Sequence, residues 1–288
     1  MRRLITAAVV VAAMLIPASS ALAAPPHHPT GTFANFGYCP LGNPNTNVCV
    51  YSKTVSGSVT TGSKKVPIVN PVVLQGGLDL NPETGQTTWI NAEGGDTLSK
   101  TPQPVPGGLL GVVAPSWWPQ LLKDLFNETI NNGFTGVTST VELAGPVQFS
   151  LLAILTGSGT AVTLPVKIKL DNPFLGSNCY IGSNSSPVQI PLTLGTTAPP
   201  PPNTPISGSQ GSVTSNPEGT YIKAAGSKLV NNSFATPGAK GCGGFLFSWA
   251  VDPLVNSIVG IPSPAGTNTA ILEGTTELGQ REAVIGSE

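Results

Sequence analysis

The sequence is poor in charge. Charged residues make up 9% of its 288 positions, against about 25% in an average soluble protein. The 13 basic and 14 acidic residues give a formal net charge of −1 at pH 7. Binding to nucleic acid requires a concentrated basic face, which so weak and mixed a set of charges does not supply. We therefore expect no nucleic acid partner.

Histidine is nearly absent. The chain has two, His27 and His28, in a proline-rich segment near its start. Ser–His–Asp and Cys–His catalysis need an imidazole that titrates near neutral pH, and many zinc and iron sites need one as a ligand. The sequence also lacks the G-x-S-x-G, S-x-x-K, phosphate-loop and dinucleotide-binding motifs. We expect no enzyme of these classes, no cofactor and no resident metal.

The first 23 residues have the pattern of a secretory signal peptide. Arg2 and Arg3 precede the uncharged apolar run from Leu4 to Ile16, and Ala21-Leu22-Ala23 supplies a small-x-small cleavage site. The apolar run is shorter than the about 20 residues that span a bilayer. We expect export, cleavage near Ala23, a secreted mature protein and no transmembrane segment in it.

Four cysteines fit an exported chain: Cys39, Cys49, Cys179 and Cys242. An even number of cysteines in an oxidising compartment predicts two disulfides, for which three connectivities are possible. Turn residues fill the segment between Cys39 and Cys49, which favours that pairing and leaves Cys179 with Cys242. A zinc site is the alternative, but it would require closely spaced cysteine pairs and histidine.

Short strands and many turns dominate the rest of the sequence, which contains 34 Gly and 29 Pro residues. We predict a mainly-β chain, an antiparallel β-sandwich-like single domain over 36–280. Before it we expect a flexible proline-rich arm over 24–35, and after it a tail over 281–288, with a proline-rich surface loop over 196–219. Predicted strands cover 50–60, 66–69, 72–80, 86–90, 134–143, 147–156, 160–170, 188–194, 220–224, 228–234, 245–251 and 267–278.

One amphipathic helix is expected over 116–130 and a second short helix over 252–259. In the first, apolar residues recur at three- and four-residue steps and Ser116 is a cap. Asp252-Pro253 supplies a cap and a first-turn proline for the second. Trp117 and Trp118 are candidates for contact with a sugar or a partner, although tryptophans at a helix start also serve to anchor it to the core.

Acidic residues leave one catalytic chemistry open, because glycoside hydrolysis needs only two carboxyl groups about 5 to 9 Å apart. Asp79-x-Asn81-x-Glu83 also has the alternate spacing of a calcium loop, but Thr84 replaces the glycine that such a loop requires. Solvated turn residues are the simpler interpretation of all these positions. The candidate carboxylates are Asp79, Glu83, Glu93, Asp96, Glu142 and Asp171.

The chain resembles an uncharacterised family of secreted actinobacterial proteins. The resemblance is carried by the segment from Phe36-Gly37-Tyr38-Cys39-Pro40 to Cys49-Val50-Tyr51, by Thr101–Gly111, by Ala114–Asn127, by Lys169–Ser183, by Asn231–Gly244 and by Asp252-Pro253-Leu254-Val255-Asn256. It implies export and carries over no catalytic residue.

These observations predict an exported, non-enzymatic protein that is extracellular or associated with the cell envelope. Two alternatives remain open. One is a module that binds an apolar or carbohydrate ligand, suggested by the low charge and by Trp117 and Trp118. The other is a carboxylate-based glycan hydrolase.

Overall fold

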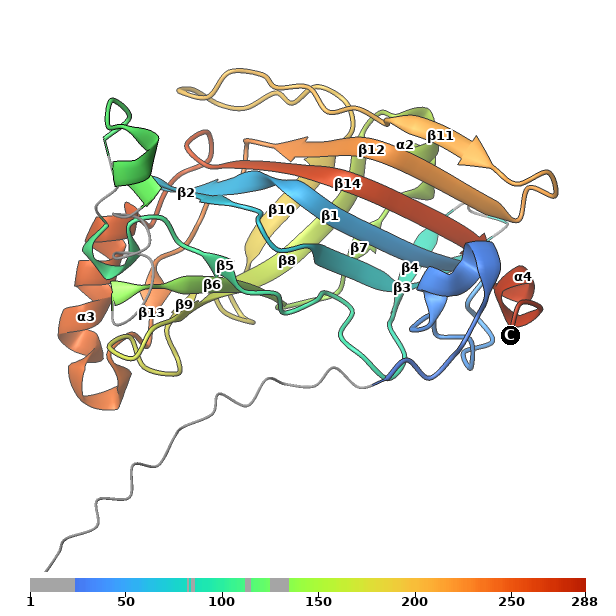
Figure 1. Ribbon diagram of the computed structural model, residues 1–288, viewed down its shortest axis with the longest axis horizontal. Coiled ribbons are helices and arrows are strands. Elements are labelled where there is room, and N and C mark those ends of the chain that lie inside the picture. Colours follow the sequence, from blue (N-terminus) through green and yellow to red (C-terminus); the bar gives the residue numbers. More distant parts are fainter. Residues whose placement is uncertain (1–23, 82, 84–85, 112–114, 125–134) are drawn as a thin grey trace, which may run out of the picture.

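One antiparallel sheet of 14 strands forms the molecule and curls into a half-barrel (Figure 1). The computed structural model describes residues 24–81, 83, 86–111, 115–124 and 135–288. The prediction of a mainly-β, antiparallel single domain is confirmed. The two layers of this domain are the two walls of the one curled sheet.

The strands are β1 Val48–Thr61, β2 Lys64–Pro67, β3 Val72–Leu80, β4 Thr87–Asn91, β5 Gln103–Pro104, β6 Thr138–Leu143, β7 Gln148–Phe149, β8 Thr160–Asp171, β9 Tyr180–Ile181, β10 Val188–Thr193, β11 Ser212–Ser215, β12 Tyr221–Asn231, β13 Ala239–Lys240 and β14 Thr269–Gln280. The helices are η1 Gly31–Phe36, η2 Gly108–Leu110, α2 Leu151–Thr156, α3 Gly244–Val259 and α4 Arg281–Ile285. The main path through the sheet runs β13-β9-β8-β10-β12-β14-β1-β3-β4.

Alternation along β8 shows why this sequence forms a half-buried strand. Val162, Leu164, Val166, Ile168 and Leu170 are buried, as expected from their period of two. The lysines between the last three of them are partly exposed on the other face. β8 therefore presents one apolar face to the core.

The curl of the sheet coincides with two bulges that flank Gly274 in β14. Against β14, the register shifts between Thr54 and Ser56 in β1 and between Ala225 and Ser227 in β12. A Cβ atom at Gly274 would lie 2.0 Å from the carbonyl oxygen of Lys53. Only glycine fits so close an approach, and bulges bend a strand and increase its twist.

Two predicted strands are helices instead. The prediction of a strand over 147–156 is wrong beyond Phe149, because Ser150 caps α2 by accepting a hydrogen bond from the Ala153 amide at 3.2 Å. The prediction of a strand over 245–251 is also wrong, since these residues form the first half of α3 and Pro253 lies inside the helix. Apolar residues at nearly every position of 245–251 hide the helical period.

The predicted helix over 116–130 lies only partly within the described residues. Residues 120–124 are helical, and 125–130 lie outside the described part of the chain. The expected surface loop over 196–219 is largely exposed and contributes β11 beside β12.

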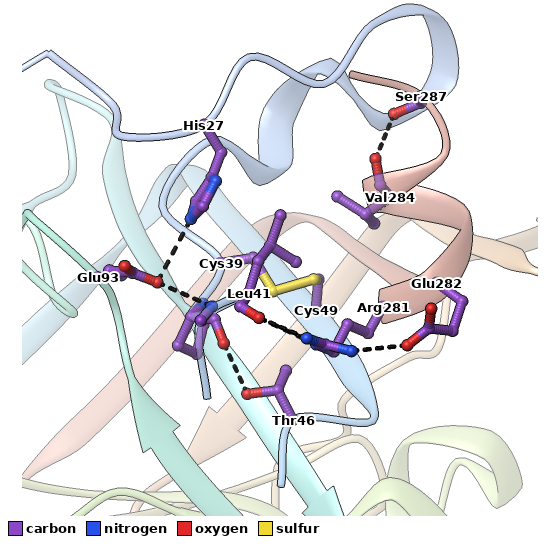
Figure 2. The surroundings of a disulfide bond; sticks show 12 residues. His27, Cys39, Leu41, Thr46, Cys49, Glu93, Arg281, Glu282, Val284 and Ser287 are labelled. Atoms are coloured by element: carbon purple, nitrogen blue, oxygen red, sulfur yellow. Dashed lines mark hydrogen bonds and ion pairs between the residues drawn. A yellow bond between two sulfur atoms is a disulfide. The ribbon is translucent and has the colours of Figure 1, made fainter. Parts of the chain in front are cut away.

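The N-terminal segment over 24–35 is bonded to the C-terminal segment over 281–288. This differs from the flexible arm expected over 24–35. The Thr30 amide donates to the Ser287 carbonyl at 3.1 Å, and the His27 ring lies 3.3 Å from both Glu93 and Glu288. Figure 2 shows Arg281 of α4 donating from Nε and Nη2 to the Leu41 carbonyl at 3.1 and 2.7 Å. Backbone and side-chain hydrogen bonds therefore fix segments that composition alone marks as loose.

Both predicted disulfides are present, as Cys39–Cys49 and Cys179–Cys242. Cys39–Cys49 lies beside α4 (Figure 2). Cys179–Cys242 joins the connection between β8 and β9 to the segment just before α3. Cys49, Cys179 and Cys242 have no exposed surface. Two buried disulfides are typical of proteins that fold in an oxidising compartment.

Candidate functional site

Helix α3 covers one end of the half-barrel, and α4 lies at the opposite end of the long axis (Figure 1). The segment before α3 runs back along the helix, and two side chains of α3 bind its backbone. Asp252 accepts from the Cys242 and Gly241 amides at 2.7 and 3.2 Å. Asn256 accepts from the Ala239 amide at 2.6 Å. With the Cys179–Cys242 disulfide, these bonds fix α3 to the sheet.

The other end of α3 is fixed by the β1–β2 turn. The Ser63 amide donates to the Val259 carbonyl at 2.8 Å. Gly62 has a φ of +58°, and a Cβ atom there would lie 2.3 Å from that same carbonyl oxygen. This turn therefore needs glycine at position 62, and α3 is a lid fastened at both ends.

An apolar cavity of about 320 Å³ lies beneath this lid. A volume of this size is at the lower end of the about 300–1,000 Å³ found for small-molecule pockets. A smaller cavity of about 70 Å³ shares several lining residues with it and extends between β1–β2 and β6–β8. The larger cavity is lined by Lys64, Val105, Gly108, Leu109, Val137, Leu170, Phe174, Leu175, Val251, Leu254, Val255, Ile258 and Val259.

Among the described residues that line either cavity, Lys64 is the one that carries a charge. Its Nζ donates to the Gly111 carbonyl at 2.9 Å, which places the ammonium group at the β2 side of the cavity. The ammonium has three donors, so one carbonyl leaves it able to bind an anionic group. The cavity thus combines an apolar wall with a single cation.

A larger hollow of about 780 Å³ lies beside β9 and β13, and its lining is polar. Its charged lining residues are Lys167 and Lys240, and Lys167 lies 3.5 Å from Glu142 and 5.0 Å from the centre of the Tyr180 ring. The Tyr180 hydroxyl donates to Glu142 at 3.3 Å. Burial and the nearby Glu142 raise the pKa of Tyr180. These mutual contacts make the hollow a weaker candidate for binding.

Glu277 is the most deeply buried carboxylate described, with 4% of the residue exposed. It accepts from the Asn35 amide group at 2.8 Å and lies 3.3 Å from Lys223 Nζ. Burial and Glu277 raise the pKa of Tyr221 to about 12. Because its partners come from η1 and β12, Glu277 holds the N-terminal segment to the sheet, which is a structural role.

Trp117 and Trp118 do not line the cavity beneath α3. Their rings meet edge to face, 6.2 Å apart at 83°. Trp117 is 80% exposed, so at this residue the anchoring alternative does not apply. The 115–124 segment that carries them lies at the α3 end of the molecule (Figure 1).

The candidate carboxylates are distributed over the molecule, and four of them have partners of their own. Glu93 binds His27, Asp96 binds Lys100 at 2.8 Å, Glu142 binds Lys167, and Asp171 binds Lys169 at 2.9 Å. Asp79 lies on β3 opposite Thr88, and Glu83 is exposed in the following turn.

The possible calcium loop lies partly outside the described residues, because 82 and 84 are among those not described. Within the described ranges, no group of three or more His, Cys, Asp or Glu side chains is arranged to hold a metal ion.

The cavity and its lid are the features that sequence reasoning missed. The inner face of α3 carries Val251, Val255 and Val259, spaced by four residues, which is a helical signal. Phe245, Leu246 and Trp249 hide that signal because they make the outer face apolar as well.

Comparison with protein-family models, with curated proteins and with solved structures gave no match. The resemblance to a secreted actinobacterial family therefore stays a prediction. Among the described helices, none combines the length and the apolar character needed to cross a membrane.

Proposed function

We propose that this chain is an exported, non-catalytic protein that binds an amphiphile with an apolar chain and an acidic head group. The cavity beneath α3 carries the proposal, because its lining is apolar apart from Lys64. Buried apolar walls favour a hydrocarbon chain by about 25 cal/mol per Å² removed from water. The Lys64 ammonium would hold a carboxylate at the β2 side.

Export is part of the same proposal. The basic, apolar and small-residue segments over 1–23 support it, as do the two buried disulfides. Mass spectrometry of the protein secreted by the native host should find a mature chain that begins at Ala24. A cell-associated protein that retains residues 1–23 would contradict this.

Binding is tested with a dansyl-labelled undecanoic acid, whose fluorescence rises in an apolar cavity, and with the corresponding alcohol as a neutral probe. The Lys64→Met variant should bind the acid about tenfold more weakly and the alcohol equally well, because a charge-assisted contact contributes about 1.5–3 kcal/mol. Lys65→Met is the matched control, since Lys65 is the exposed neighbour and does not line the cavity.

A second variant fills the cavity. Ile258→Trp should abolish binding of both probes, whereas Val213→Trp on β11, at an exposed apolar position away from the lid, should not. Saturable binding that survives Ile258→Trp, or the absence of saturable binding in the natural chain, would overturn the proposal. Quenching of tryptophan fluorescence by cell-wall sugars instead would favour the carbohydrate alternative.

A further inference from the structure

The outer face of α3 is apolar and uncovered, although most exposed helix faces are polar. Phe245 is 98% exposed, Trp249 is 79% exposed and Leu246 is 70% exposed. Phe247 and Leu254 are also exposed, at the border with the inner face, and Leu254 lines the cavity as well. The one charged residue of the helix, Asp252, is engaged by backbone amides. The first part of α3 therefore offers aromatic and aliphatic side chains to solvent.

Further apolar side chains lie at the same end of the long axis. Trp117 and Leu121 are each 80% exposed, and Phe174 is 63% exposed. Figure 1 shows the 115–124 segment and α3 at this end, opposite α4. Exposed apolar patches that bring together several elements mark sites of association.

The charged residues near the two ends differ in their balance, while others, such as Lys53, Lys228 and Glu273, lie along the strands between the ends. The α4 end carries the carboxylates Asp79, Glu83, Glu93, Glu218, Glu277, Glu282 and Glu288 with the cations Lys223 and Arg281. The α3 end carries the lysines Lys64, Lys65, Lys123 and Lys240 with the carboxylates Asp124, Asp171 and Asp252. Of these three carboxylates, Asp171 pairs with Lys169, and Gln120 donates to Asp124 at 2.7 Å.

The geometry points to the surface of an anionic lipid bilayer as the partner of the α3 end. Tryptophan and phenylalanine beside exposed lysines are the composition of helices that lie in the membrane interface, and lysines near an anionic leaflet are attracted to it. The acidic α4 end would face away from such a surface. At about 24 Å for 16 residues, α3 is long enough to lie on a bilayer but too short to span one.

A second copy of the chain fits this face less well. The exposed apolar residues of α3 span about 15 Å of helix, so by themselves they offer less than the about 800 Å² that each partner in a stable complex buries. Two copies related by a twofold axis through this face would also bring their exposed lysines together. A bilayer needs no matching shape and is itself negatively charged.

The test is flotation of the purified mature protein with vesicles of phosphatidylglycerol and phosphatidylcholine, compared with pure phosphatidylcholine. The natural chain should bind the anionic vesicles, and binding should fall as salt is raised. The Phe245→Ser/Trp249→Ser double variant should reduce the bound fraction at least about tenfold. Leu152→Ser/Val213→Ser is the matched control, because it removes exposed apolar side chains elsewhere on the molecule.

Lys65→Glu should weaken binding to anionic vesicles by more than about fivefold, since one lysine near the surface contributes about 1 kcal/mol and the substitution also adds a repelled carboxylate. Lys53→Glu, an exposed lysine of β1 outside the α3 end, should have little effect. The Ile258→Trp variant separates this inference from the proposed function, because it should block the cavity and leave vesicle binding intact.

Two results would overturn the inference. One is that the natural chain fails to bind anionic vesicles. The other is a dimer in light scattering that the Phe245→Ser/Trp249→Ser variant converts to a monomer, which would show that this face joins two copies. The exposed positions of both residues let the variant fold, and its thermal unfolding verifies this.

Discussion

The two ends of the half-barrel are fastened in different ways. At the α4 end, the N-terminal segment, α4 and the Cys39–Cys49 loop are held by charged and polar contacts, including His27 with Glu93 and Arg281 with Leu41 (Figure 2). At the α3 end, polar contacts such as those of Asp252 and Asn256 only hold the lid in place, and the surfaces around it are apolar.

The two ends of the long axis therefore differ in role: contacts that hold the fold lie at the α4 end, and both proposed binding features lie at the α3 end. The α4 end closes the chain on itself and directs acidic groups to solvent. The α3 end leaves a cavity on the inner side of its helix and an apolar strip on the outer side. The apolar face that folding does not bury is the feature proposed to meet a partner, and it lies opposite the end where the two termini are bonded together.

Removing the disulfides should give the largest effect and distinguish the two ends. With a separation of 63 residues, Cys179–Cys242 should contribute about 4 kcal/mol on the chain-entropy model, whereas Cys39–Cys49, with a separation of 10, should contribute about 3 kcal/mol. Urea unfolding of Cys179→Ala/Cys242→Ala and of Cys39→Ala/Cys49→Ala measures both values.

The same two variants should differ in binding. Loss of Cys179–Cys242 frees the start of α3 and should weaken binding of the dansyl acid under conditions where the protein is still folded. Loss of Cys39–Cys49 should leave that affinity unchanged. Equal effects on affinity would contradict the separation of the two ends.

Alkaline pH should destabilise the α4 end through Tyr221. Its pKa is about 12 in the folded protein, above the ordinary value of about 10, so folding favours the neutral phenol. This stabilisation is fully present below pH 10 and is lost as the pH rises through 12. Between pH 9 and pH 11.5 the free energy of unfolding should fall by about 2 kcal/mol from this residue.

Tyr221→Phe is the control for that loss. The substitution keeps the ring that packs edge-on against Phe33 and Phe36 and removes the ionising hydroxyl. Its free energy of unfolding should therefore decline less over the same pH interval. Parallel decline in both proteins would assign the alkaline sensitivity to other groups.

Two single contacts should give the smallest effects. Asn256→Ala leaves the buried Ala239 amide without its acceptor and should lower the free energy of unfolding by about 1–2 kcal/mol. Arg281→Ala removes donors to the Leu41 carbonyl. Because the Arg281 side chain is 23% exposed, water can enter in its place, and the free energy of unfolding should change by less than about 1 kcal/mol. Thermal unfolding of the two variants tests this order.

Local patterns in the sequence were sufficient where one physical signal dominated. The period of two in β8 and the turn residues between Cys39 and Cys49 predicted the strand and the disulfide. Hydrophobic periodicity did not predict the helix α3, because apolar residues on both of its faces leave no period to detect. The ordered N-terminal segment was missed because its partners, such as Ser287, are more than 250 residues away in the sequence.

The position of β14 also determines when the fold can be completed. Residues 269–280 lie between β12 and β1, and each of these neighbours pairs with them along most of its length. β1, the first long strand to be synthesised, therefore gains its second neighbouring strand only after β14, one of the last strands, has been made. Such distant pairing is slow, so a chain that crosses a membrane before folding would still be unpaired on that edge when it emerges.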